Sequence, residues 1–532
     1  MTQTQRVDAV VVGAGFAGLY MLHRLRGLGL SVRVLEAGSD VGGTWFWNRY
    51  PGARCDVESL EYSYQFDEDL QQEWSWTERY ASQPEILDYI RHVAERFDLR
   101  RDIRFDTRVT AAHFDATTVE WHIQTDSSAE FSTRWCIMAT GCLSVPTWPA
   151  LEGADSFTGS TFHTGRWPHE GVDFSGQRVG VIGTGSSAIQ SIPIIAGQAR
   201  ELYVFQRTPN FSVPARNEPM DPELEARIKA GYADFRARNG QMQSAFGVRH
   251  PRCEGSALEA SEAERQRQFE HHWQLGGLLF LRAYGDLLVN TEANELAQAF
   301  IRDKIRSVVE DPEVAEKLLP DSVVGCKRLC ADSGYFETFN QPHVTLVDLR
   351  REPIERITPA GIRHAGSEYE LDSLVFATGF DAMTGALARI DIRGRDGTTL
   401  RERWEDGPRT YLGLQVAGFP NLFTITGPGS PSVLTNMLYS IEQHVDWIAG
   451  CVADLSARGL TTIEATGKAE ADWVAHVNAM ASHTLFTHCN SWYLGANVPG
   501  KPRVFMPYLG FPEYVARCNE VRARNYEGFV LS

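Results

Sequence analysis

The sequence predicts an α/β fold with two Rossmann-like dinucleotide-binding domains and a helical insertion. Two glycine-rich turns carry most of this prediction, because each follows a β-branched run and precedes a helical pattern. The third observation is a change to helical spacing between residues 214 and 324. At 532 residues the chain is too long for one compact core, so two to four domains are expected.

The first glycine turn suits a dinucleotide that carries no 2′-phosphate. Gly13, Gly15 and Gly18 follow a predicted strand and give the spacing G-x-G-x-x-G ahead of a helix. They permit a tight turn, the approach of a pyrophosphate to the backbone and close packing of helix on strand. A second predicted strand ends at Glu36, whose carboxylate can accept hydrogen bonds from ribose hydroxyls. An acid there favours FAD or NAD over NADP.

The stretch after this strand decides in favour of FAD. A glycine pair is followed by an aromatic-rich loop, a common continuation in FAD-binding folds. These rings can pack against an isoalloxazine, or they can form a surface loop that packs only on the core. The rings belong to Trp45, Phe46, Trp47 and Tyr50.

The second glycine turn has the form G-x-G-x-x-A, with Gly183, Gly185 and Ala188 at its fixed positions. The next predicted strand leads to Arg207, whereas the strand after the first turn leads to an acid. An arginine there can form a fork onto a 2′-phosphate, although it can also be an ordinary solvated arginine. The contrast between the two turns predicts FAD at the first and NADPH at the second.

The chain must leave the FAD domain and return to it. Two Ala-Thr-Gly triplets, at residues 139–141 and 377–379, follow apolar runs and are the predicted crossings. Asn290 or Thr291 is the predicted N-cap of a helix within the insertion, which we expect to border the substrate pocket. The expected division is 1–141 and 380–532 for FAD, 142–213 and 325–379 for NADP, and 214–324 for the helical subdomain.

Composition excludes several kinds of partner. The net charge of −17 argues against nucleic acid and anionic membranes, and no apolar run approaches the roughly 20 residues that cross a bilayer. The N-terminus shows no signal-peptide pattern. Nine cysteines at irregular spacings include no C-x-x-C pair and predict neither a disulfide framework nor a metal site. We therefore expect a cytoplasmic protein that does not work as a disulfide reductase.

A dodecapeptide at residues 157–168 lies just before the second turn. It fits the pattern F-x-G-x-x-x-H-x-x-x-W-P at every fixed position, with Phe157, Gly159, His163, Trp167 and Pro168. The histidine invites an acid–base role, but a histidine in a linker is as often a packing and hydrogen-bonding residue.

This dodecapeptide resembles the fingerprint of type I Baeyer–Villiger monooxygenases, and the resemblance covers nearly the whole chain. It implies an enzyme that uses FAD and NADPH to insert one oxygen atom of O2 beside a ketone carbonyl, giving an ester or lactone through a flavin peroxide. No obligatory protein partner is implied. Related N-hydroxylating and sulfoxidising monooxygenases usually lack the Trp167-Pro168 ending, and they remain the alternative.

The resemblance also implies residue roles. Arg328 would hold the peroxide anion and polarise the ketone carbonyl, Asp56 would pair with Arg328, and His163 would coordinate domain movement. The FAD contacts implied by matching position are Gly13, Gly15, Gly18, Glu36, Thr44, Trp45, Phe46, Trp47, Asp56, Tyr62, Val109 and Met437. The implied NADP contacts are Arg54, Gly183, Thr184, Gly185, Ser186, Ser187, Ala188, Ile189, Gln206, Arg207, Thr208, Lys327, Arg328 and Trp492, the last on a mobile loop. The loop at residues 427–437 is similar to that of relatives that accept aryl, steroid or large cyclic ketones.

Overall fold

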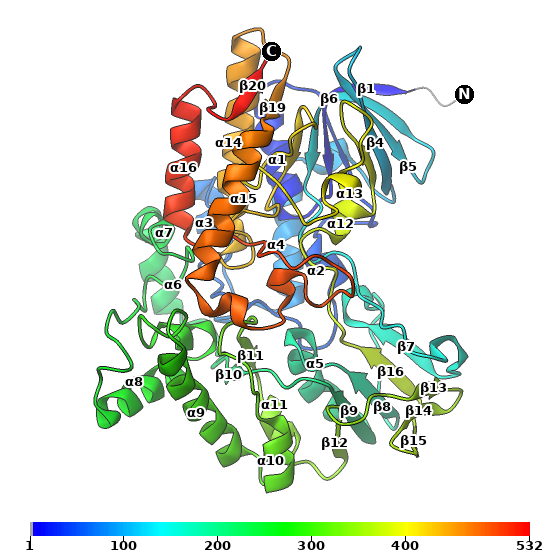
Figure 1. Ribbon diagram of the computed structural model, residues 1–532, viewed down its shortest axis with the longest axis vertical. Helices are drawn as coiled ribbons and strands as arrows, with labels where there is room; N and C mark the ends of the chain where they lie inside the picture. Colours follow the sequence, from blue (N-terminus) through cyan, green and yellow to red (C-terminus); the bar gives the residue numbers. More distant parts are fainter. Residues whose placement is uncertain (1–3) are drawn as a thin grey trace.

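The computed structural model describes residues 4–532. It contains two large β-sheets, one in each half of the molecule (Figure 1). The upper sheet has the order β17-β4-β5-β6-β1-β2-β3, with β18 beside β6. The lower sheet has the order β12-β9-β8-β16-β7 and is parallel throughout. The upper strands are β1 (Gln5–Val12), β2 (Val32–Leu35), β3 (Ile103–Arg104), β4 (Val109–Asp115), β5 (Glu120–Thr125), β6 (Glu130–Met138), β17 (Asp391–Arg393) and β18 (Leu422–Thr424). The lower strands are β7 (Ser160–His163), β8 (Arg178–Ile182), β9 (Glu201–Gln206), β12 (Val344–Asp348) and β16 (Ser373–Phe376).

Both predicted strand–turn–helix–strand units form, one in each sheet. Helix α1 (Phe16–Gly27) connects β1 to β2, and α5 (Ser186–Ala196) connects β8 to β9. In each unit the two strands pair in parallel, as expected when a right-handed helical crossover joins neighbouring strands. The buried β-branched residues of β1 and β8 explain why both strands lie at the centre of their sheets.

The two Ala-Thr-Gly triplets lie where the chain passes from one half to the other. Each follows a strand, β6 above and β16 below, and each packs against the glycine turn of its own sheet. Gly13 has φ 106° and a Cβ there would lie 2.6 Å from the Ala139 carbonyl oxygen; at Gly183, φ is 115° and the corresponding distance to Ala377 is 2.4 Å. Glycine is thus required at both turns, because the crossing backbone occupies the space of a side chain.

Beyond the triplets the two connections run antiparallel and hydrogen-bond to each other. Thr147 N donates to the Gly379 carbonyl at 2.9 Å, and Asp381 N donates to the Val145 carbonyl at 2.8 Å. The halves of the molecule are therefore joined by a two-stranded connection, which restricts the movements available between them.

The predicted helical insertion lies at the lower left of Figure 1, beside the lower sheet. The Asn290 side chain accepts a hydrogen bond from Ala293 N and caps α9, which settles the predicted choice between two caps. The insertion contains α6 (Pro222–Lys229), α7 (Tyr232–Gly240), α8 (Glu262–Leu275), η4 (Gly277–Arg282), α9 (Thr291–Val308) and α10 (Pro312–Leu318). The parallel pair β10 (Ser212–Pro214) and β11 (Cys330–Asp332) closes its base.

The remaining elements cover the faces of the sheets or lie at their edges (Figure 1). The long helix α14 (Met437–Ala457) packs against α1, and within residues 4–532 no helix combines the length and apolar character needed to cross a membrane. The other helices are α2 (Thr44–Trp47), α3 (Glu68–Glu73), α4 (Gln83–Arg96), α11 (Tyr335–Thr338), α12 (Gly385–Ala388), α13 (Leu400–Arg403), α15 (Gly467–Ser482) and α16 (Phe511–Ala523). Short 3₁₀ turns include η3 (Thr164–Arg166), η5 (Leu485–His488) and η6 (Trp492–Leu494). The small sheets are β13 (Arg356–Thr358) with β14 (Gly361–His364) and β15 (Ser367–Glu370), and β19 (Ile463–Ala465) with β20 (Phe529–Leu531).

The cysteines require one correction. A disulfide joins Cys326 to Cys489, with their Cα atoms 6.2 Å apart, although the spacing of the cysteines predicted no disulfide framework. The two residues are separated by 163 positions, so only the fold brings them together. The other seven cysteines are free.

Candidate active site

Both glycine turns leave their helix N-termini open to a phosphate. Gly15 and Gly185 are the N-caps of α1 and α5, and neither helix receives a side-chain cap within the described residues. A Cβ on Gly185 would meet no atom within 4 Å, so this glycine borders open space. Uncapped N–H groups and the positive end of the helix dipole suit a pyrophosphate, so both turns fit a dinucleotide.

Glu36 closes the first turn. Its Oε2 accepts from Ala14 N at 2.6 Å and its Oε1 from Gly38 N at 2.7 Å. Burial raises the pKa of this carboxyl, while the backbone hydrogen bonds act in the opposite direction. A carboxylate oxygen accepts more than one hydrogen bond, so both oxygens retain capacity for ribose hydroxyls.

The second turn ends beside two cations without a counter-ion. Arg207 is exposed and Lys327 is half-buried, and neither makes an ion pair with any residue in 4–532. Burial lowers the pKa of Lys327, Asp321 raises it, and the neighbouring charge of Arg207 lowers it further. Two adjacent and unpaired cations at the ribose end of a nucleotide turn suit a 2′-phosphate.

Other residues predicted at the second turn already have partners within the fold. The Thr184 hydroxyl donates to the Thr208 carbonyl at 2.8 Å, and Ser187 and Thr164 share a hydrogen bond of 3.0 Å. Gln206 is fully buried, and its Nε2 donates to the Lys317 carbonyl at 2.7 Å. The side chain of Gln206 therefore supports the strand rather than facing the turn.

Some side chains of the aromatic loop are buried in the core, and others are partly exposed. Trp45 and Phe46 are buried, whereas Trp47 is half-buried in the one-turn helix α2. Trp45 Nε1 donates to the Tyr62 hydroxyl at 3.3 Å. Tyr50 donates to Gln190 Oε1 at 2.8 Å and so attaches this loop to helix α5 of the other half.

An ion pair between Arg328 and Asp56 lies between the two halves. Arg328 Nε donates to Asp56 Oδ2 at 2.6 Å, and Nη2 donates to Oδ1 at 2.7 Å, which is bidentate geometry. The two residues are 272 positions apart. Asp56 follows the aromatic loop and Arg328 precedes β11, so the pair joins the FAD-type half to the end of the insertion.

The surroundings of Arg328 keep it charged and orient it. Nη1 donates to the Val433 carbonyl at 2.6 Å, which brings the loop at residues 427–437 to the same place. Burial alone would lower the Arg328 pKa, but the Asp56 carboxylate raises it instead. Tyr493 is buried beside Arg328; burial raises its pKa to about 12, although the arginine opposes this shift. The phenol therefore stays protonated at neutral pH.

The dodecapeptide is part strand and part connector. Ser160–His163 forms β7, the edge strand of the lower sheet, and Trp167 is buried in the lower core. A Cβ on Gly159 would lie 2.4 Å from the Asp372 carbonyl oxygen, so a larger residue would separate the strand from its neighbour. Phe157 packs at the edge of a small lower cluster.

His163 contacts both connections between the halves. Its Nδ1 accepts from Gly165 N at 2.9 Å, so Nε2 carries the proton and faces the Thr147 carbonyl at 3.4 Å and the Thr378 hydroxyl at 3.3 Å. Burial lowers the pKa of His163 to about 4. A neutral ring that contacts both connections is suited to a structural role in the linker.

Comparison with known proteins agrees with this geometry. Residues 10–256 match the family described as pyridine nucleotide-disulphide oxidoreductase. The chain is 43% identical, over 98% of its length and 96% of the relative, to a Baeyer–Villiger monooxygenase from Pseudooceanicola batsensis. The chain belongs to the Baeyer–Villiger monooxygenase family. Its members use FAD and NADPH to convert ketones to esters or lactones, and this chain is such an enzyme.

Two further relatives mark the range of the family. A solved structure described as oxidized steroid monooxygenase bound to NADP is 54% identical, with a TM-score of 0.94 over 99% of both chains. A phenazine N-monooxygenase from Lysobacter antibioticus is 42% identical over 98% of this chain and 97% of the relative. Proteins that are 42–54% identical to this chain thus include enzymes named for more than one kind of substrate.

Three further side chains lie at the site of this Baeyer–Villiger monooxygenase and were not predicted from the sequence. Arg166, a variable position of the dodecapeptide, places its guanidinium 4.2 Å from the centre of the Trp47 ring. Lys501 makes an ion pair of 2.7 Å with Asp381 in the second connection. Tyr493 lies beside Arg328. Asp381 stands in a motif that carries the family resemblance, but no local pattern marks Lys501 or Tyr493.

For four predicted cofactor contacts, the position in the fold neither supports nor opposes the predicted role. Arg54 Nη1 donates to Glu78 Oε2 at 2.6 Å, and the Val109 side chain belongs to a core cluster of the upper half. Met437 is the first residue of α14, and Trp492 is half-buried in η6. Their assignments stay predictions.

The buried, neutral state of His163 predicts a pH-dependent stability. Above pH 6.5 the ring is neutral in both folded and unfolded chains, so it contributes no pH dependence. As pH falls from 6.5 toward 4, the unfolded chain gains a proton that the folded chain does not, and stability falls by on the order of 3 kcal/mol. Thermal unfolding should therefore show a flatter acid slope for His163→Asn. Buried His444, whose pKa burial lowers to about 3, leaves part of the slope in place. An unchanged slope in the variant would contradict a neutral His163.

Proposed function

We propose that Arg328 and Asp56 form the catalytic centre of this Baeyer–Villiger monooxygenase. The observation that carries the proposal is the bidentate ion pair, which fixes a charged arginine against the carboxylate that follows the aromatic loop. Oxygen insertion beside a carbonyl creates negative charge on oxygen, and a fixed guanidinium in a largely buried site stabilises such charge. Bound FAD would supply activated oxygen and bound NADPH the hydride, and the turns described above fit both nucleotides.

The geometry of Arg328 leaves donors for a substrate. Three of its five N–H bonds go to Asp56 and the Val433 carbonyl, so the rest can point toward a ketone oxygen and a developing anion. Asp56 fixes the plane of the guanidinium without neutralising all its donors. We assign Arg328 the role of polarising the carbonyl and Asp56 the role of positioning Arg328.

We assign the 2′-phosphate of NADPH to Arg207 and Lys327. Arg207→Ala should raise KM for NADPH by about 10–100-fold, because it removes a charged hydrogen-bond donor, and should leave KM for NADH nearly unchanged. Arg134→Ala is a matched control, since Arg134 is an exposed arginine of β6 without an ion pair. Initial rates with both nucleotides measure the effect. Equal increases for NADPH and NADH would remove the phosphate role.

We infer that the substrate is a large ketone, of the aryl, steroid or large cyclic kind. The loop at 427–437 supports this, since its Val433 carbonyl holds Arg328 and so places the loop at the proposed centre. The 54% identity to the steroid monooxygenase supports the same direction. A panel from acetone to macrocyclic and steroidal ketones, scored by ester formed, tests it. Faster turnover of acetone and cyclohexanone than of every larger ketone would contradict it.

N-hydroxylation and sulfoxidation are the second candidate chemistry, because of the phenazine N-monooxygenase relative. The same panel should therefore contain an aromatic amine and a sulfide. Oxidation of these compounds alone, without ester formation from any ketone, would favour this candidate.

We also propose that the chain is divided into the three predicted domains and that the enzyme is cytoplasmic. The strands at 5–138 and 391–424 share the upper sheet, and those at 160–206 and 344–376 share the lower sheet, in support of the division. Seven of the nine cysteines are free, which supports a reducing compartment; there the Cys326–Cys489 disulfide would be exposed to reduction by cellular thiols. Fractionation of the producing cells tests the location.

A further inference from the structure

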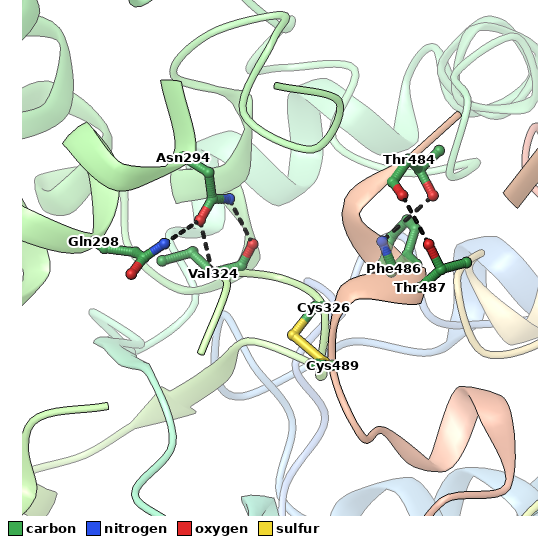
Figure 2. The surroundings of a disulfide bond; sticks show 8 residues. All are labelled: Asn294, Gln298, Val324, Cys326, Thr484, Phe486, Thr487 and Cys489. Carbon is green, nitrogen blue, oxygen red and sulfur yellow. Dashed lines mark hydrogen bonds between the residues drawn. A yellow bond between two sulfur atoms is a disulfide. The ribbon is translucent and has the colours of Figure 1, made fainter. Parts of the chain in front are cut away.

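The Cys326–Cys489 disulfide joins two segments that both carry residues of the proposed site (Figure 2). Cys326 comes directly before Lys327 and Arg328, and Cys489 comes three residues before Trp492. The bond is therefore a covalent connection between the arginine segment and the loop that begins at η5. None of the roles assigned above uses it.

The arginine side of the disulfide is firmly held. Val324, two residues before Cys326, donates its N–H to Asn294 Oδ1 and accepts from Asn294 Nδ2, both at 2.9 Å (Figure 2). Gln298 Nε2 donates to the same Asn294 Oδ1 at 3.0 Å. Since Asn294 and Gln298 lie on α9, this anchor belongs to the helical insertion.

The loop side has two kinds of attachment. Leu485 N donates to the Leu288 carbonyl at 2.8 Å, and the Thr484 hydroxyl accepts from Phe486 N (Figure 2). Farther along, Asn497 donates to the Phe380 carbonyl, and Lys501 pairs with Asp381. The loop is thus tied to the insertion at one end and to the connection between the halves at the other.

Between these attachments the loop carries the two aromatic residues of the site. Trp492 is half-buried, and Tyr493 is buried beside Arg328, while its backbone carbonyl accepts from Met506 N at 3.0 Å. Besides the disulfide, the stretch that leads into them is held by η5, by polar contacts and by Phe486, which packs in the core against Tyr493 and Phe505. The covalent bond therefore limits how far this stretch can move from Arg328.

The disulfide can be opened from solvent. Cys326 is fully buried, but Cys489 is partly exposed, so a thiolate would attack the Cys489 sulfur. A mixed disulfide forms there while the Cys326–Cys489 bond breaks and Cys326 leaves as a thiolate. The second thiol of a dithiol then closes on the first, releases the Cys489 thiolate and leaves the dithiol oxidised. The two protein sulfurs are reduced by two electrons.

We propose that Cys326 and Cys489 are redox-dependent positioning residues of this enzyme. In the disulfide form the loop is held across Arg328 and the bound NADP; in the dithiol form the loop opens, and the nucleotide leaves more easily. The proposal rests on the assignment of Arg328 and Trp492 to the site. A dithiol such as a reduced thioredoxin-like protein is the class of reductant that would operate it.

The test uses the full-length enzyme loaded with FAD, as disulfide and after treatment with dithiothreitol that is then removed. Mass analysis under non-reducing conditions verifies the state of each thiol. Stopped-flow measurement of NADP⁺ release should give a rate about tenfold higher for the dithiol form, because the tether sets a high local concentration of the loop. The hydrogen peroxide formed per NADPH, measured with a ketone present, should rise as well.

Variants separate the disulfide from other thiols. Cys489→Ser should release NADP⁺ as fast as the reduced wild type and should not respond to dithiothreitol. Cys253→Ser, which removes another partly accessible cysteine, should behave like the wild type and respond to dithiothreitol. Reduction of the native wild type needs no substitution, so a variant that folds poorly leaves the test intact.

Two results would overturn the proposal. One is an air-oxidised enzyme in which mass analysis finds Cys326 and Cys489 as free thiols. The other is equal NADP⁺ release and equal peroxide yield in the two forms, while ketones are still oxidised. An enzyme that oxidises no ketone in either form would instead contradict the proposed function.

Discussion

Arg328→Ala is expected to lose ester formation while NADPH still reduces the bound flavin. The substitution removes the charged donor nearest the proposed reaction centre, and loss of one such fixed donor commonly costs about 3–4 kcal/mol of barrier. The rate of ester formation should thus fall by at least 10²–10³-fold. Anaerobic stopped-flow measures the reduction step, and chromatography measures the ester.

Arg328→Lys is the matched variant, because it keeps a positive charge but not the bidentate fork onto Asp56. We expect it to recover little of the lost activity. Undiminished ester formation by the alanine variant would show that Arg328 is not catalytic, and full recovery by lysine would show that charge alone suffices.

Asp56→Ala is expected to have the second largest effect. It removes the only carboxylate bonded to Arg328 among the described residues and leaves the guanidinium without its orienting partner. Breaking a largely buried pair commonly costs about 3–5 kcal/mol of folding stability, so the melting temperature should drop. Because a misplaced catalytic group can lower a rate by about 10²-fold, ester formation should fall by at least that factor. Asp56→Asn keeps the shape and one acceptor, and we expect a smaller loss of stability.

A double-mutant cycle tests whether the two residues act as one unit. If Asp56 works by positioning Arg328, then Asp56→Ala combined with Arg328→Ala should form ester no more slowly than Arg328→Ala alone. Independent, additive losses would assign Asp56 a separate role. Circular dichroism and flavin content verify that each variant is folded and loaded.

The local parts of the fold were predictable because local chemistry specifies them. Gly13 and Gly183 stand where the backbone has positive φ and another chain segment touches the turn, so only glycine fits and the motif is visible in the sequence. Asn290 caps α9 through a hydrogen bond to a backbone N–H only three residues away, so the start of the helix could be predicted from the local sequence. The crossings followed from apolar strands ending in the same triplet.

Contacts between distant segments were less accessible to sequence reasoning. The Cys326–Cys489 bond and the Lys501–Asp381 pair join residues whose neighbours give no signal of one another. Gln206 matched its expected position, yet the fold turns its amide toward Lys317. Arg328 and Asp56 were paired only by family resemblance, since nothing in the spacing of 272 residues predicts their contact. Such contacts depend on the packing of whole domains.

The most direct test of the central claim is oxygen transfer under ¹⁸O₂ by the wild type and Arg328→Ala. Mass spectrometry of the ester, with NADPH consumption measured in the same samples, gives the number of oxygen atoms inserted per nucleotide oxidised. We predict one ¹⁸O atom in the ester per NADPH for the wild type with a large ketone. For Arg328→Ala we predict NADPH consumption with hydrogen peroxide in place of ester. Labelled ester from the variant at the wild-type yield would contradict the account.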